Sequence, residues 1–135
     1  RRRRFQELPK KIKVSDARQI FEYMHPLLGD LNHEEFWVIF LSQSMHIVGR
    51  KQISKGGVTA TVADAKLIFK AAIEETVPNI IVCHNHPSGN LQASEDDKRL
   101  TQKLKTGSQS LDISLLDHVI IAGSSYTSFV EEGLL

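Results

Sequence analysis

Three short runs of consecutive apolar residues place the strictest limits on the fold of this chain. They fall at residues 36–41, 80–83 and 119–122 and are rich in β-branched and aromatic side chains. Such runs predict strands that are buried inside a sheet, the second reaching His84 and the third beginning near Leu115. Two further strands are predicted, an antiparallel partner of the first run and a last strand, at residues 46–53 and 126–129.

Segments with apolar residues at helical spacing alternate with these strands. The predicted helices cover residues 15–27, 62–76 and 94–105. Ser15 is predicted to cap the first helix, and Thr61 with Asp64 to form a capping box for the second. Because helices alternate with strands but a hairpin comes first, the sequence predicts an α/β fold, a mixed β-sheet flanked by helices.

The charge of the chain is divided unevenly along its length. Residues 1–13 carry seven basic side chains and one acidic side chain, whereas the other residues carry ten basic and fifteen acidic side chains. An arginine run of this kind is typical of a nucleic-acid-binding arm, but it also suits a solvated linker. We interpret residues 1–14 as a basic linker remnant from a missing N-terminal region and residues 15–135 as one domain, since 135 residues is an ordinary domain length.

Composition excludes several classes of protein. The single cysteine, Cys83, excludes a disulfide scaffold and a zinc site built from several thiolates. No apolar run approaches the ~18–20 residues of a membrane span, and no apolar stretch follows the arginines as in a signal peptide. We therefore expect a cytoplasmic protein with no membrane association.

The densest group of polar side chains follows the second apolar run. Residues two apart on a strand lie on one face, so His84 and His86 can converge on one ion. A turn then leads into the third predicted helix, whose first turn contains Asp97. Two histidines and one carboxylate leave a fourth position for water, and this ligand set is typical of a catalytic zinc site.

A hydrolytic zinc site also needs a proton acceptor. Glu34 and Glu35 stand at the start of the first apolar strand and are the upstream candidates, whereas Glu95 and Asp96 are expected to point outward from their helix. Ser94 could offer its hydroxyl to a developing oxyanion.

Each of these features also has a purely structural interpretation. Ser94 and Asp97 have the spacing of a plain capping pair, the histidine pair could be structural, and Glu34 could be a solvated charge at a strand end.

Taken together, these residues resemble a known motif. They match the JAMM motif of the JAB/MPN metalloprotease superfamily at every fixed position, and the surrounding segments are similar to the C-terminal domain of the RadC family over about residues 15–135. The motif reads His84-x-His86-Pro87-Ser88-Gly89-x-x-x-x-Ser94-x-x-Asp97. The surrounding segments are His33-Glu34-x-Phe36, Leu116-Asp117-His118-Val119-Ile120-Ile121 and Phe129-x-Glu131-x-Gly133-Leu134.

The resemblance implies a fold related to cytidine deaminase and a role for each motif residue. His84, His86 and Asp97 correspond to zinc ligands, Glu34 to the general base, and Ser94 to a residue that stabilises the tetrahedral intermediate. The implied reaction is hydrolysis of an amide, in a peptide or isopeptide, by water that zinc activates. RadC proteins carry a DNA repair label, so the alternative is a non-catalytic, DNA-associated accessory or binding module.

Two further residues and one surface complete the sequence-based expectations. His118 could hydrogen-bond a ligand or substrate, or it could be a core-edge histidine paired with its neighbour Asp117. Cys83 should point to the opposite strand face from His84 and belong to the core. A homodimer could form through Leu134, Leu135 and the open edge of the hairpin.

Overall fold

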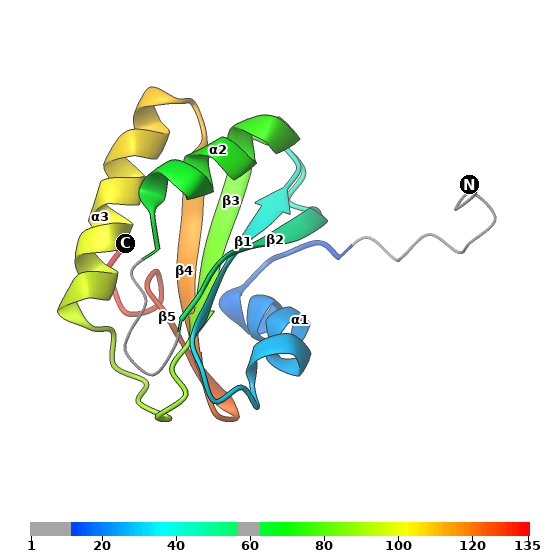
Figure 1. Ribbon diagram of the computed structural model, residues 1–135. Coiled ribbons are helices and arrows are strands. Elements are labelled where there is room, and N and C mark those ends of the chain that lie inside the picture. The colour runs from blue at the N-terminus through cyan, green and yellow to red at the C-terminus, as the bar shows by residue number, and fades with distance from the viewer. Residues whose placement is uncertain (1–11, 57–62) are drawn as a thin grey trace.

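The computed structural model describes residues 12–56 and 63–135, which form one mixed sheet with helices on both faces (Figure 1). The strands lie in the order β2-β1-β3-β4-β5, with β3 in the centre. Only the β3–β4 pair is parallel, and the other neighbouring strands pair antiparallel. The strands are β1 (Glu35–Leu41), β2 (Ile47–Lys55), β3 (Asn79–Asn85), β4 (Ser114–Ala122) and β5 (Ser125–Ser128), and the helices are α1 (Ala17–Leu28), α2 (Ala65–Glu75) and α3 (Glu95–Ser110). The predicted α/β fold is confirmed.

The continuous apolar runs are buried because helices cover the sheet on both faces. Helix α1 packs on one face, while α2 and α3 pack on the other (Figure 1). Every residue of β3 is buried. Alternate residues of β3 point into different cores, so that Cys83 packs on the α1 side, as predicted, and Val82 packs on the α2 side.

The helix starts differ from the prediction. Asp16, not Ser15, caps α1, because its carboxylate accepts the Gln19 amide (3.1 Å) while the Gln19 side chain accepts the amide of Asp16 (3.2 Å). Helix α2 begins at Ala65 with Asp64 as its cap, so Asp64 does not act three residues into the helix. Thr61 and Val62 lie outside the described residues, and so do residues 1–11 of the basic linker remnant.

One helix is longer than predicted, and one predicted strand contains two polar residues. Helix α3 continues to Ser110, and Gly107 in its last part makes room for the ring of Phe69 from α2. Strand β4 runs unbroken through Asp117 and His118, although these polar residues interrupt the apolar run. Among the described residues, no helix is both long and apolar enough to cross a membrane.

Candidate metal centre

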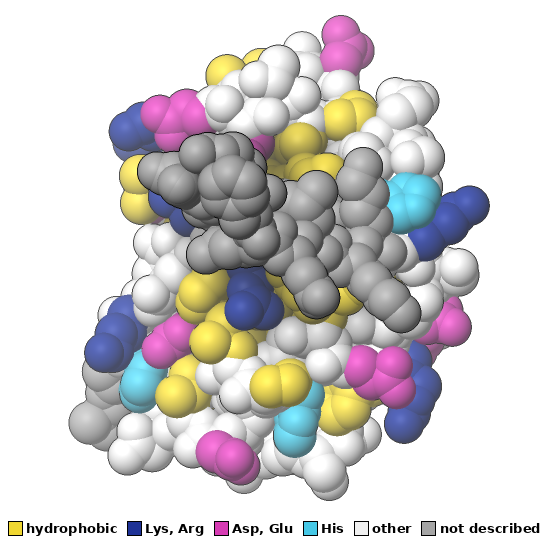
Figure 2. Space-filling model, turned by 90° about the vertical axis from the view of Figure 1, so that its right-hand side faces the viewer, with side chains coloured by type: hydrophobic (Ala, Val, Ile, Leu, Met, Phe, Trp, Pro, Cys, Tyr) yellow, Lys and Arg dark blue, Asp and Glu magenta, His cyan; other side chains and the backbone are white. Residues whose placement is uncertain are grey.

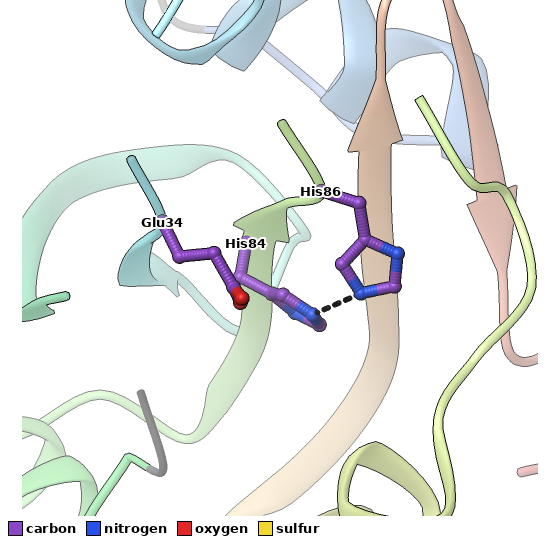
Figure 3. A group of neighbouring side chains, drawn as sticks. All are labelled: Glu34, His84 and His86. Atoms are coloured by element: carbon purple, nitrogen blue, oxygen red, sulfur yellow. Dashed lines mark hydrogen bonds between the residues drawn. The ribbon is translucent and has the colours of Figure 1, made fainter. Parts of the chain in front are cut away.

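The polar residues of the motif meet at one end of the sheet. His84 lies near the end of β3, His86 directly follows this strand, and Asp97 lies in the first turn of α3. Antiparallel pairing places Phe36 of β1 opposite His84, so Glu34, just before β1, reaches the same sheet end from a distant part of the sequence. Figure 3 shows Glu34, His84 and His86 directed toward one another.

Four donor atoms from three residues of the motif, two nitrogens and two oxygens, lie close together. The Nε2 atoms of His84 and His86 lie 3.1 Å apart. The Asp97 carboxylate lies 3.2 Å from each of them, through Oδ1 to His84 and through Oδ2 to His86. Donor atoms bound at ~2.0–2.1 Å to one tetrahedral zinc ion would be ~3.3–3.4 Å apart. The spacing therefore fits a single small metal ion.

Glu34 completes the cluster. One carboxylate oxygen of Glu34 and one nitrogen from each of His84 and His86 all lie within 4.8 Å of one another, so these three residues form a group that can hold a metal. The Glu34 carbonyl accepts the Gly56 amide (2.8 Å), which ties this residue to the end of β2. The second carboxylate of the cluster, that of Asp97, lies closer to both imidazoles than 4.8 Å.

The surroundings of His86 orient its ring. Its Nδ1 donates to the carbonyl of Asn90 at 2.7 Å, within the turn that follows β3. A neutral imidazole has one donor and one acceptor nitrogen, so Nε2 of His86 offers a lone pair to the cluster. In metal sites, a ligand histidine usually donates its other ring N–H, the one that does not face the metal, to a carbonyl or carboxylate.

Charges in the cluster stabilise one another. Burial by itself would raise the pKa of Asp97, but hydrogen bonds from His84 and His86 lower that pKa well below its ordinary range. Burial favours a lower pKa for His86, whereas its hydrogen bond with Asp97 raises it, and the net pKa is above the ordinary value. The cluster is therefore a place where an ionised carboxylate and positive charge are favoured together.

Asp97 serves α3 as well as the cluster. Ser94 caps the helix by accepting the Asp97 amide at its Oγ (3.0 Å), and Asp97 Oδ2 accepts the Ser94 amide (2.9 Å). The plain capping pair and the contact with the histidines, which the sequence offered as alternatives, are thus both present. Ser94 Oγ keeps its own proton for another acceptor, but the described contacts of this side chain are those of a cap.

The neighbouring acidic residues face elsewhere. The carboxylate of Glu35 binds His33 Nε2 (2.7 Å) and Trp37 Nε1 (3.0 Å), so it turns away from the cluster. Glu95 and Asp96 are exposed on α3, as expected, and pair with Lys98 and Arg99 of the same helix. Of the two upstream candidates for a proton acceptor, only Glu34 lies at the site.

His118 contacts a residue of the cluster directly. Its ring is fully buried, and its Nε2 lies 2.8 Å from Nδ1 of His84. Only its backbone amide pairs with Asp117, donating to Oδ1 at 2.7 Å. Of the two interpretations of His118, the contact with a candidate ligand therefore describes the side chain.

Sequence reasoning missed Asn85. This buried amide accepts from the Glu35 backbone (2.8 Å) and donates to the carbonyl of His33 (2.9 Å), so it fastens the segment that carries Glu34 to the end of β3. The only signal for such a role is a polar residue at a buried strand end between two histidines.

The sequence pattern of the RadC-like JAB domain matches residues 14–134. The chain is 44% identical over 134 residues to a UPF0758 protein of Flavobacterium johnsoniae, covering 99% of this chain and 58% of that protein. It is 41% identical over 131 residues to a UPF0758 protein of Porphyromonas gingivalis, covering 96% of this chain and again 58% of the relative. The chain thus spans somewhat more than half the length of these curated relatives. It belongs to the RadC-like JAB domain family.

Proposed function

We propose that this domain is a zinc-dependent hydrolase of amide bonds, in a peptide or isopeptide. The observation that carries the proposal is the convergence of two imidazole nitrogens and one carboxylate within 3.2 Å, with a second carboxylate beside them. In this assignment His84, His86 and Asp97 hold the metal, because their atoms have the closest spacing, and Glu34 remains free for proton transfer. These ligands are two nitrogen donors and one carboxylate. Three protein ligands leave the fourth position of a tetrahedral zinc ion open for water.

Zinc bound there would polarise the amide carbonyl and lower the pKa of water toward ~7. Glu34 accepts the proton of the attacking water and passes it to the departing amine. Its carboxylate lies beside both imidazoles and, unlike that of Asp97, does not cap a helix. Ser94 donates its hydroxyl proton to the developing oxyanion. Asp97 and the helix cap keep the first turn of α3 fixed beside these groups.

Metal analysis tests the ligand assignment. We expect one zinc per wild-type chain after loading, and loss of that zinc in His84→Ala. Asp97→Asn should also lose affinity for zinc, whereas Asp96→Asn, one residue away but exposed, should bind like wild type. Because two histidines and a carboxylate also suit iron(II), the analysis should measure all first-row metals. Wild type and His84→Ala that stay equally empty would refute the site.

Catalysis is tested with a peptide library, with and without a chelator. We expect cleavage that the chelator abolishes, that Glu34→Gln loses while keeping its zinc, and that Glu35→Gln retains. The Glu35 carboxylate makes this control stringent, because it is adjacent in sequence but turned toward His33 and Trp37. Normal turnover by Glu34→Gln would exclude Glu34 as the base.

The basic linker remnant favours a second candidate function, that of a non-catalytic module that associates with DNA. Residues 1–13 carry seven basic side chains, whereas on the face shown in Figure 2 the described acidic and basic side chains are interspersed. DNA binding through the basic linker remnant should weaken steeply as the salt concentration rises, and it should disappear when Arg1, Arg2, Arg3 and Arg4 are replaced by Gln. Unchanged DNA binding by that variant would show that the basic linker remnant does not bind DNA.

A further inference from the structure

Two buried side chains connect His84 to the backbone of Asp97. His118, on β4, lies 2.8 Å from His84 Nδ1 through its Nε2 and 2.6 Å from Thr101 Oγ1 through its Nδ1. Thr101, one turn after Asp97 on α3, donates its hydroxyl proton to the Asp97 carbonyl at 2.7 Å. His118 and Thr101 are 0% and 2% exposed, so water does not compete for these bonds.

The chemistry of each group fixes the direction of this chain of hydrogen bonds. A carbonyl oxygen only accepts, so the single hydroxyl proton of Thr101 points to Asp97 and its oxygen must accept from Nδ1–H of His118. The other nitrogen of a neutral His118 is then an acceptor, and it takes the proton of His84 Nδ1. In its neutral form, His84 is left with a lone pair on Nε2, the atom that faces His86 and Asp97.

The opposite direction leaves groups unsatisfied. If Thr101 donated to His118, its oxygen and the Asp97 carbonyl would face each other at 2.7 Å with no proton between them. His84 would then carry its proton on Nε2, directed into the cluster. A buried pair of acceptors without a proton is costly. The lone pair that the first direction leaves on His84 faces the cluster, where a proton shared with His86 and Asp97, or a bound ion, can satisfy it. The first direction is therefore favoured.

Aromatic packing holds the rings in this arrangement. The His118 ring stacks on Phe129 with centroids 4.5 Å apart, and the His84 ring stacks on Phe36 at 5.4 Å. Neither ring can turn over without displacing these neighbours, because this end of the sheet is closely packed.

We infer that Thr101 and His118 are positioning residues that set the tautomer of His84 before a metal binds. The inference rests on the proposed metal centre for its function, but the tautomer itself is a property of the metal-free protein. Together with the bond from His86 to Asn90, the relay presents both imidazoles to the cluster as acceptors. The Asp97 backbone would therefore orient His84 while the Asp97 side chain binds the same ion.

Nitrogen-15 NMR of the metal-free wild type tests the direction of the relay without any variant. We expect the ring protons of His84 and His118 on Nδ1 in both residues. A proton on Nε2 of His118 would overturn the inference.

Zinc affinity, measured by competition with a chromophoric chelator, tests the consequence. Thr101→Val keeps the shape of the side chain but removes its hydroxyl, and should lower zinc affinity about 10–100-fold, as is typical when a partner behind a ligand is lost. Thr101→Ser keeps the hydroxyl and should bind like wild type. Equal affinity in all three proteins would contradict the relay.

These outcomes separate the relay from the metal centre. If wild type itself does not bind zinc, the proposed function fails, and the relay is then judged by NMR of metal-free Thr101→Val. In that variant we expect the His84 proton to move from Nδ1 to Nε2, whereas an unchanged tautomer would refute the relay.

Discussion

At the scale of single residues, the acid–base balance of the cluster has a measurable effect on stability. The pKa of His86 is raised in the fold, although burial opposes this shift, because Asp97 hydrogen-bonds to the protonated ring. A group with a raised pKa in the folded state stabilises the protein fully below its unfolded pKa of ~6.5. That stability is lost as the pH rises through the folded value.

We therefore expect His86 to contribute a loss of stability to urea as the pH rises above ~6.5 in the metal-free protein. Burial lowers the pKa of His118, so this histidine contributes the opposite slope at lower pH. His86→Gln should remove the loss of stability above ~6.5, since the glutamine amide does not titrate. Zinc affinity should change in the opposite direction and increase with pH, because the metal competes with protons for the same nitrogen. A variant with the slope of wild type would show that His86 is not the titrating group.

Cys83 gives a second prediction at this scale. Burial, followed by the negative charge of Asp117, raises the pKa of its thiol far above the ordinary value. A protonated and inaccessible thiol is a poor nucleophile. We expect no reaction with a thiol reagent at pH 8 in the native protein and one equivalent in urea. Rapid labelling of the native protein would contradict burial of Cys83 in the α1-side core.

At the scale of elements, the close approach of α2 and α3 depends on Gly107. A Cβ built at this position would lie 2.6 Å from the ring of Phe69. Gly→Ala in a helix interior normally stabilises by roughly 0.5–1 kcal/mol, but here the clash should reverse the sign.

We expect Gly107→Ala to lower the free energy of unfolding by about 1 kcal/mol, the low end for overpacking, because Phe69 is only half-buried and can yield. Thr106→Ala, at the exposed neighbouring position, is the control for helix propensity. Combining Gly107→Ala with Phe69→Leu should restore stability. A stabilised Gly107→Ala single variant would show that the two helices do not approach so closely.

The elements also show what the sequence could and could not predict. Apolar periodicity located all three helices and five strands, because burial against a sheet imposes that pattern locally. The extent of β4 was predicted, but the reason why Asp117 and His118 are tolerated in a buried strand was not. Their partners lie elsewhere in the chain, where Asp117 accepts from Ser128 Oγ (2.5 Å) and from the Val130 amide (3.0 Å).

The candidate site was also predictable in part. The convergence of His84, His86 and Asp97 was predictable, because strand alternation and a capped helix start are local rules. The choice of Glu34 over Glu35 followed from the family resemblance alone, since the approach of Glu34 to the histidines depends on the pairing of β1 with β3. Thr101 was invisible, because nothing local distinguishes its hydroxyl from that of any other helical threonine.

At the scale of the whole molecule, a bound metal would join β3 to α3 and should stabilise the fold by mass action. At a free zinc concentration about 100 times the dissociation constant, the stabilisation is ~2.7 kcal/mol. We expect the melting temperature to rise with zinc and to fall back with a chelator. His84→Ala should show no such shift, and a zinc-dependent rise in that variant would place the metal elsewhere.

The distribution of the cluster along the chain has a consequence for folding. His84, His86 and Asp97 span 14 residues, whereas Glu34 is separated from His84 by 50 positions. Closing the short loop costs less entropy than pairing β1 with β3. If the domain is the proposed hydrolase, a folding chain would therefore assemble its metal ligands first and its base last. The proposed hydrolytic activity would then require the completed sheet, so an unfinished chain would bind the ion without cleaving amides.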